Sequence, residues 1–321
     1  MRALVVSNMR PDATHPERGS FVRDQVAALR ALGGADVELY EFAPGARALA
    51  RAALDLRRRF RSTRAGGSRA PFDVVHAHFG LTAWPALAAP ARVRALTLHG
   101  TDVSHPRTRL LTLAALPRID VLATVSHALA DQLPRRAARR AQVLPCGVDL
   151  DRFHPIARPR ARSQLGLDAD RSYVLFASDP ARPEKRFDRA RELADSLDVE
   201  LLTLGGVDPA RVPLLVNAAN AVLVPSEREG FGLAVLEALA CDVPVLATPV
   251  GIHREALADL PGTLCAPFDI DRWRAALLAL LARDGDDDRR IPGRDRAERW
   301  SAARMAERVL AAWGVARERA G

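Results

Sequence analysis

Short apolar segments alternate with helix-like stretches along nearly the whole chain, and this alternation limits the possible folds more than any other feature. Each apolar segment runs into a polar or glycine-containing loop, and a stretch with helical spacing follows. Strands separated by helical segments pair in parallel through right-handed crossovers. The sequence therefore predicts an α/β protein with doubly wound parallel sheets, whose expected strands are 3–7, 37–42, 73–79, 95–99, 121–126, 142–144, 173–177, 199–204, 221–225, 243–247 and 263–266.

The alternation is interrupted once, at residues 150–163, where prolines and arginines are frequent. Such a stretch is typical of a linker between domains. A chain of 321 residues is long enough for two domains of ordinary size. We therefore expect two Rossmann-like domains, 1–155 and 156–298, and a final helix in 299–321. In such sheets ligands bind beyond the carboxyl ends of the strands, so the loops that follow strands are where we look for function.

The basic charge lies in the first half of the chain. Residues 1–155 hold 23 arginines against 13 acidic residues, whereas residues 156–321 hold 24 basic against 26 acidic residues. A basic half suits an anionic partner, although drift toward arginine in the whole proteome explains it equally well. Arginines are densest in 47–69, around several leucines, which is typical either of a helix lying on an anionic membrane or of a solvated excursion.

Lysine occurs once in the sequence. Of the 47 basic residues, 46 are arginine, and the single exception is Lys185. A lysine that survives such drift indicates a place where a compact ammonium is needed and a planar guanidinium does not fit. Because one exception among 47 also arises by chance, the position of Lys185 after an expected strand matters as much as its rarity.

Several classes of protein find no support in the sequence. No apolar run approaches the roughly 20 residues that span a bilayer, and the three cysteines have neither metal nor redox spacing. The Asp-x-Asp pairs at 149/151, 168/170 and 269/271 do not follow strong apolar strands, so we interpret them as acids of solvated turns and expect no metal. Nucleic-acid binding has no motif beyond charge. These features suit a reduced, cytoplasmic protein that could lie peripherally on the inner face of the cell membrane.

The stretch Glu229-Gly230-Phe231-Gly232 follows an expected strand and opens an expected helix over 232–240. Backbone N–H groups at such a helix start bind anions. Glu237 lies eight residues after Glu229, which would put the two acids on a similar face. Two carboxylates beside an anion site suit a ligand that presents sugar hydroxyls as well as phosphate. From spacing alone, solvated charges on the helix face explain the pair at least as well.

These residues resemble the E-x7-E signature of a large family of retaining glycosyltransferases, family GT4, which has the GT-B fold. Further stretches similar to the family, in the same order along the chain, are DVVHAH at 73–78, LHGTD at 98–102, PCGVD at 145–149 and PEK at 183–185. Cys146 stands where the family usually has asparagine. The stretch from Asn8 to Val26 resembles a narrower group, the teichuronic-acid-type and related transferases of cell-surface polysaccharides.

The resemblance implies two Rossmann-like domains that face across a cleft, with the C-terminal helix returning to the N-terminal domain. It implies a nucleotide-sugar donor, a glycan, lipid-linked or small-molecule acceptor, and no cofactor. The catalytic residues it implies are His99, Lys185 and Glu229. The donor-binding residues it implies are Gly19, Arg182, Lys185, Glu229, Gly230, Phe231, Gly232, Leu233 and Glu237, and those on the acceptor side are Ser20 and Asp102. Arg182 is a displaced substitute, because the usual Gly-Arg pair reads Asp179-Pro180 here.

Two alternatives are compatible with two Rossmann-like units. An NAD-dependent dehydrogenase would share the architecture, but no Gly-x-Gly-x-x-Gly follows the first strand of either half. A non-catalytic protein of the same fold could bind a polyanion through its basic half, although Lys185, Glu229 and Glu237 are all intact. Only 14 residues separate Gly206 from Ala221, where the family usually fits a further strand and helix. We therefore expect a trimmed region near the nucleotide base.

Overall fold

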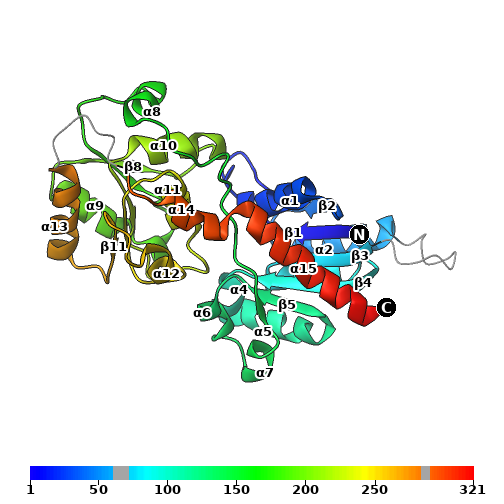
Figure 1. Cartoon of the computed structure of the whole chain (residues 1–321). Helices are drawn as coiled ribbons and strands as arrows, with labels where there is room; N and C mark the ends of the chain where they lie inside the picture. The colour runs from blue at the N-terminus through cyan, green and yellow to red at the C-terminus, as the bar shows by residue number, and fades with distance from the viewer. Residues whose placement is uncertain (61–71, 283–289) are drawn as a thin grey trace. The chain divides into compact units, whose positions relative to one another are not determined.

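The computed structural model describes residues 1–60, 72–282 and 290–321, and divides into two compact units. The first unit holds residues 1–147 together with 302–321, and the second holds residues 148–301 (Figure 1). Arg61, Arg64 and Arg69 of the arginine-rich segment lie outside the described residues.

The first unit is built on a six-stranded parallel sheet of order β2-β1-β3-β4-β5-β6. The strands are β1 Arg2–Ser7, β2 Asp36–Glu41, β3 Phe72–His78, β4 Ala91–Leu98, β5 Val121–Thr124 and β6 Gln142–Val143. The central strands are buried on both faces because helices cover both sides, which explains their continuous Val, Leu and Ala runs. The predicted strands of this half are confirmed, with ends that differ by a few residues.

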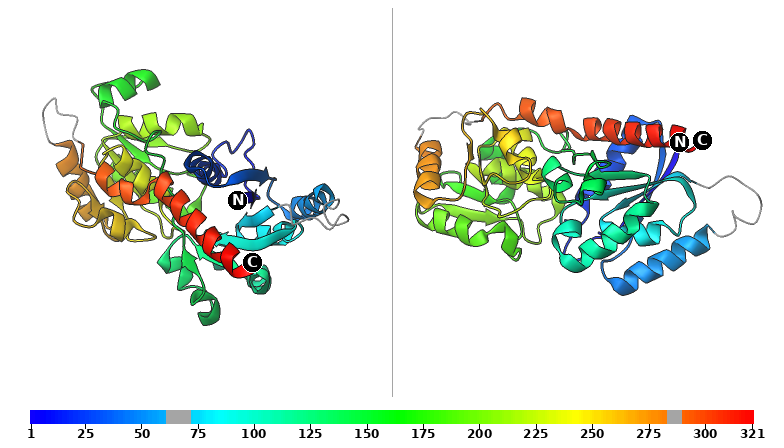
Figure 2. Two further views of the ribbon diagram at one scale, coloured as in Figure 1. Left: turned by 45° about the vertical axis from the view of Figure 1, so that its right-hand side comes forward. Right: turned by 90° about the horizontal axis from the view of Figure 1, so that it is seen from below.

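Helices cover this sheet on both faces. They are α1 Ser20–Leu32, α2 Ala46–Arg59, α3 Ala83–Ala86, α4 Thr101–Ser104, α5 Pro106–Ala115, α6 His127–Ala130, α7 Arg135–Ala138 and α15 Ala302–Ala320. The last helix, α15, packs against α1 and β4, while α2 lies on the other face of the sheet (Figure 2). Fully buried Trp313 joins α15 to a core that includes Leu29 of α1 and Val93 of β4.

The second unit is built on a five-stranded parallel sheet of order β11-β10-β9-β7-β8. Its strands are β7 Tyr173–Phe176, β8 Glu200–Thr203, β9 Ala221–Val224, β10 Val245–Ala247 and β11 Leu264–Cys265. The strands predicted for this half are thereby confirmed. Its helices are α8 Arg158–Leu165, α9 Phe187–Asp195, α10 Val212–Ala218, α11 Leu233–Ala240, α12 His253–Leu257, α13 Ile270–Leu281 and α14 Arg294–Ala297. Buried Trp273 of α13 packs with Leu193 of α9 over the sheet.

Residues 150–163 were expected to be an irregular linker, but part of this stretch is helical. Helix α8 forms within it, Ala161 and Arg162 are buried, and residues from Val148 onward belong to the second unit. The Arg162 guanidinium donates to the carbonyl oxygen of Ala218 at 3.1 Å and to Asn220 Oδ1 at 2.8 Å. The prolines and arginines that suggested an irregular linker therefore start and anchor a short helix, since proline is well tolerated in a first helical turn.

Candidate functional site

The candidate residues of each unit follow the strands where the sheet order reverses. In the second unit the reversal lies between β7 and β9. The loop after β7 carries Lys185, and the loop after β9 carries Glu229. In the first unit the reversal lies between β1 and β3, so Gly19 follows β1 and His78 ends β3. Ligands of doubly wound sheets bind at such positions.

Lys185 and Glu229 form a close ion pair. Lys185 ends a short 3-10 helix, Pro183–Lys185, and its Nζ donates to both carboxylate oxygens of Glu229 at 2.7 Å. Ser226 Oγ donates to Glu229 Oε1 at 2.8 Å. The side chains of Lys185 and Glu229 are only 13% and 10% exposed. A second link joins the two loops, because the Glu227 amide donates to the carbonyl oxygen of Glu184 at 2.9 Å. The ammonium is thus held by the fold and little screened by water.

Glu229 stays ionised despite its burial. Burial alone would raise the pKa of this carboxyl, but the Lys185 ammonium and hydrogen bonds from Lys185 and Ser226 outweigh it, so the pKa is lowered. At neutral pH the loop therefore presents a carboxylate, which accepts hydrogen bonds from hydroxyl groups. The same carboxylate fixes the position of Lys185.

The start of α11 is open to an anion. The helix begins at Leu233, its N-cap is Gly232 with φ of 112°, and no side chain caps it. The first amides of a helix lack internal partners, so those near Gly232 are available to a negatively charged group. Glu229 precedes the helix, and Glu237 lies about one turn inside it. Glu237 is half-buried.

His253, which we did not single out from the sequence, lies beneath this helix start. It is fully buried at the beginning of α12, and its Nδ1 donates to the carbonyl oxygen of Thr248 at 2.8 Å. Its Nε2 is therefore an unprotonated acceptor, and among the described residues it is buried without a hydrogen-bond partner. Burial lowers the pKa of His253. A Cβ on Gly232 would lie 2.5 Å from this Nε2, so the imidazole leaves room only for glycine.

We expect Gly232→Ala to destabilise the second unit by about 2–3 kcal/mol, because alanine would be strained at this positive φ and would collide with His253. Chemical denaturation of the variant measures the loss. The double variant Gly232→Ala/His253→Ala removes the collision but keeps the strain, so it should lose less than the two single losses added together. Additive losses would show that His253 does not impose the glycine.

Two arginines near Lys185 in the sequence are each held by acidic side chains. Arg182 is half-exposed, and its guanidinium donates to Glu184 Oε1 at 2.7 and 3.0 Å rather than to Glu229. Arg186 directly follows Lys185 and is held by Asp188 at 2.6 Å and by Glu227. Arg186 is thus a second cation beside the Lys185 loop that sequence reasoning missed, since one arginine among 46 gave no signal.

In the first unit, the start of α1 offers the corresponding backbone site. Gly19 is the N-cap of α1, with φ of 72°, and a Cβ there would lie 2.4 Å from the carbonyl oxygen of Met9. Only glycine therefore fits where the loop after β1 turns into the helix. Ser20 is the first helical residue and is half-buried.

His99 lies at the end of β4 within an aromatic cluster. The rings of Phe21 and Phe79 pack against its imidazole with centroids 4.9 and 4.7 Å away. Its Nε2 is 3.0 Å from Nδ1 of fully buried His78. Burial and the neighbouring His78 lower the pKa of His99 well below its usual value, so the imidazole is neutral at physiological pH. A neutral imidazole can act as a hydrogen-bond donor or acceptor toward a ligand.

Asp102 is turned into the protein. Asp102 is 4% exposed, and its Oδ2 accepts from the His99 amide at 2.5 Å. Between the two roles considered from the sequence, shaping the loop and binding an acceptor, this geometry favours the first. Burial raises the pKa of Asp102 to about 6, against the opposing effect of hydrogen bonds from backbone amides.

Since its pKa is higher in the folded than in the unfolded protein, Asp102 contributes stability at low pH that is lost as the pH rises through about 6. Asp102→Asn keeps an acceptor for the backbone and does not titrate. We expect the stability of Asp102→Asn, relative to the parent, to improve by on the order of 2–3 kcal/mol between pH 4 and 7. Denaturation curves of both proteins across this range test it, and a constant difference would contradict the shifted pKa.

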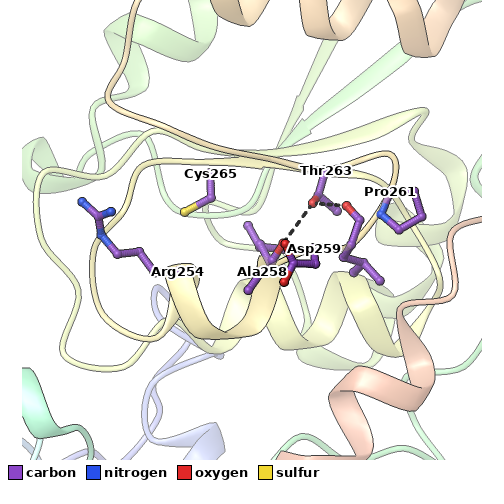
Figure 3. Close-up of a pocket in the computed structure, with 8 residues that line it drawn as sticks. Arg254, Ala258, Asp259, Pro261, Thr263 and Cys265 are labelled. Atoms are coloured by element: carbon purple, nitrogen blue, oxygen red, sulfur yellow. Dashed lines mark hydrogen bonds between the residues drawn. The ribbon is translucent and has the colours of Figure 1, made fainter.

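The Asp-x-Asp pairs serve turns and a helix cap. Asp149 and Asp168 each accept from the amide two residues on, and Asp269 caps α13. Within the described ranges, no group of three or more His, Cys, Asp and Glu residues is arranged to hold a metal ion. An open hollow of about 550 Å³ lies at α12 and β11, where Arg254, Asp259, Thr263 and Cys265 line it (Figure 3). None of the predicted site residues lines this hollow.

Two Rossmann-like units with parallel sheets are the architecture of the GT-B fold. The structure aligns with the crystal structure of HepE from Anabaena in complex with UDP-glucose at a TM-score of 0.68, with 16% sequence identity, over 98% of this chain and 100% of that one.

Sequence comparisons assign the family. Residues 5–152 match the model of Glycosyltransferase Family 4, and residues 169–298 match that of Glycosyl transferases group 1. The chain is 30% identical to the D-inositol 3-phosphate glycosyltransferase of Xylanimonas cellulosilytica, over 73% of this chain and 70% of that protein. It is 28% identical to the putative teichuronic acid biosynthesis glycosyltransferase TuaC of Bacillus subtilis, over 56% of this chain and 54% of TuaC. The chain belongs to the family 4 glycosyltransferases and is a glycosyltransferase enzyme. The dehydrogenase alternative is not favoured by these matches.

Proposed function

We propose that the protein transfers a sugar from a nucleoside-diphosphate donor to a hydroxyl of a glycan, lipid-linked or small-molecule acceptor, with retention of configuration. The observation that carries this proposal is the buried ion pair of Lys185 and Glu229 beside the open start of α11. Stabilising the charge of a departing diphosphate is the main electrostatic task of such a transfer, and a held ammonium beside the amides of a helix start suits it. The departing phosphate would assist deprotonation of the acceptor hydroxyl.

Each residue has a proposed role. Lys185 would bind the diphosphate, and the backbone from Gly230 to Leu233 would bind the sugar and phosphate. Glu229 would accept from a hydroxyl of the donor sugar, and Glu237 from the ribose. When the donor binds, Lys185 Nζ would donate hydrogen bonds both to Glu229 and to a phosphate oxygen. Arg182 would act as an accessory cation, since Glu184 already holds it.

In the first unit, His99 would contact the donor sugar, and the Gly19 backbone would approach the diphosphate. Ser20 would lie on the acceptor side, with Asp102 shaping the loop that carries His99. A UDP-glucose complex of HepE and the inositol-phosphate and teichuronic-acid names of the relatives are compatible with a nucleotide-sugar donor and a polyhydroxyl acceptor. We propose a place in the synthesis of cell-envelope polysaccharide or glycolipid on this ground.

A thermal-shift screen tests the donor class. UDP-glucose, UDP-N-acetylglucosamine, GDP-mannose, ADP-glucose and NAD⁺ are each added to the full-length protein. A sugar nucleotide at 100 times its Kd should stabilise the fold by about 2.7 kcal/mol. Stabilisation by NAD⁺ alone would overturn the proposal in favour of a dehydrogenase. A polyanion that binds in a salt-sensitive way, without any donor hydrolysis, would favour the non-catalytic alternative.

We also propose that α2 contacts an anionic membrane surface from the cytoplasmic side. Arg47, Arg51, Arg57 and Arg58 are exposed on this helix, as is Leu54. No helix in the described ranges is long and apolar enough to cross a membrane. The protein should co-sediment with phosphatidylglycerol vesicles, and the variant with these arginines replaced by glutamine should stay in the supernatant. Equal co-sedimentation with phosphatidylcholine vesicles would contradict an electrostatic contact.

A further inference from the structure

Two buried side chains of the first unit, Gln25 and His78, form a hydrogen-bonded chain that ends at half-buried His99. Gln25 lies on α1, His78 ends β3 and His99 follows β4. Gln25 Nε2 is 3.3 Å from His78 Nε2, and His78 Nδ1 is 3.0 Å from His99 Nε2. His78 is fully buried and Gln25 is 7% exposed, so water does not compete for these bonds.

The direction of each bond follows from the chemistry of the groups. An amide nitrogen only donates, so His78 Nε2 accepts from Gln25 and carries no proton. Neutral His78 then has its proton on Nδ1 and donates it to His99 Nε2. Neutral His99, which accepts at Nε2, must carry its proton on Nδ1. Burial lowers the pKa of His78 to about 3, which supports the neutral form.

His76, which lies two residues before His78 on β3, does not compete for these hydrogen bonds. Its Nδ1 accepts from the Trp313 indole N–H at 3.2 Å, because an indole nitrogen only donates. Its proton is therefore on Nε2 and is donated to Thr97 Oγ1 at 2.8 Å. His76 stacks on His78 with ring centroids 4.7 Å apart, and the stacked contact restrains the plane of His78.

We propose that Gln25 and His78 are positioning residues that lock His99 as the Nδ1–H tautomer, so that it meets its ligand as a hydrogen-bond donor. The ligand atom is then an acceptor, such as a hydroxyl oxygen of the donor sugar. The nature of that ligand rests on the proposed function, whereas the tautomer itself does not. A wrong tautomer of a histidine in an active site can cost several orders of magnitude in turnover.

Long-range ¹H–¹⁵N NMR of the ¹⁵N-labelled full chain reads the tautomer directly, with His99 assigned by comparison with His99→Gln. At pH 7 we expect His99 Nε2 to be unprotonated and Nδ1 to be protonated. A proton on Nε2 of the parent protein would overturn the proposal, and this reading needs no variant of His78 that folds.

Two matched variants connect the tautomer to turnover. His78→Asn keeps an N–H donor near the position of Nδ1, so Nε2 of His99 should stay unprotonated and kcat should fall by less than about 5-fold. His78→Asp replaces the donor with an acceptor, so Nε2 should become protonated and kcat should fall by about 10²-fold. Equal losses of kcat in both variants, at matched melting temperatures, would reduce His78 to a packing residue.

The controls separate the two proposals. If His99→Ala kept full activity, the assignment of His99 to the donor sugar would fail, while the NMR reading would still decide the tautomer. If the NMR reading failed but His99→Ala abolished turnover, the proposed function would stand and the locking role of Gln25 and His78 would be overturned.

Discussion

Lys185→Ala should lower kcat by 10³-fold or more while the fold survives. The variant removes the ammonium that Glu229 holds at 2.7 Å, and no other lysine exists in the chain. Loss of one charge-stabilising donor in a water-poor site costs about 10²–10³-fold in turnover, and a full charge on a diphosphate costs more. Steady-state transfer or donor hydrolysis, with the sugar nucleotide found by thermal shift, measures the effect.

Arg182→Ala is the matched control, because Arg182 lies three residues away but is half-exposed and bonded to Glu184. We expect it to lose less than about 10-fold. Lys185→Arg should recover little activity, since the larger, planar guanidinium would not place its charge where the compact Lys185 ammonium lies beside Glu229. Full activity of Lys185→Ala, with an unchanged melting temperature, would refute the phosphate assignment.

Trp313→Ala should destabilise the first unit by about 3–5 kcal/mol. Trp313 is fully buried on α15, packs in the core with residues of α1 and of the sheet, and donates its indole N–H to His76. Removing a buried tryptophan loses its transfer free energy, leaves a cavity and orphans a polar partner. Urea denaturation, followed by probes in each unit, measures the effect.

The second unit supplies the control for this prediction. A substitution of Trp273, which is buried on α13 of the second unit, should lower the stability of that unit instead. If Trp313→Ala shifted only the transition of the second unit, α15 would not belong to the core of the first. If Trp313→Ala shifted neither unfolding transition, Trp313 would not be part of a buried core.

Much of the fold follows from local sequence signals. The strands of both sheets were predicted because each is a short apolar run bounded by polar or glycine-containing loops, and burial on both faces enforces that pattern. The failure at 150–163 has a clear cause. Helix α8 is anchored by Arg162, whose partners lie 56 and 58 residues away, and local spacing carries no trace of such contacts.

The candidate site was predictable only in part. Lys185 and Glu229 were found because a lone lysine and a glycine-flanked acid each follow a strand, and the structure brings them together. The bond between His78 and His99 could not be found, because it depends on the neighbouring positions of β3 and β4. His253 gave no signal either, since its contact with Gly232 joins residues 21 positions apart.

The central claim is that Lys185 is held in place to bind the phosphates of a nucleotide. Calorimetric titration of UDP and of uridine into the parent and into Lys185→Ala tests it most directly; GDP and guanosine, or ADP and adenosine, replace them if the screen selects another base. The account predicts that Lys185→Ala weakens binding of the nucleoside diphosphate by 10²-fold or more and leaves binding of the nucleoside unchanged. Equal affinity of both proteins for the diphosphate would contradict it.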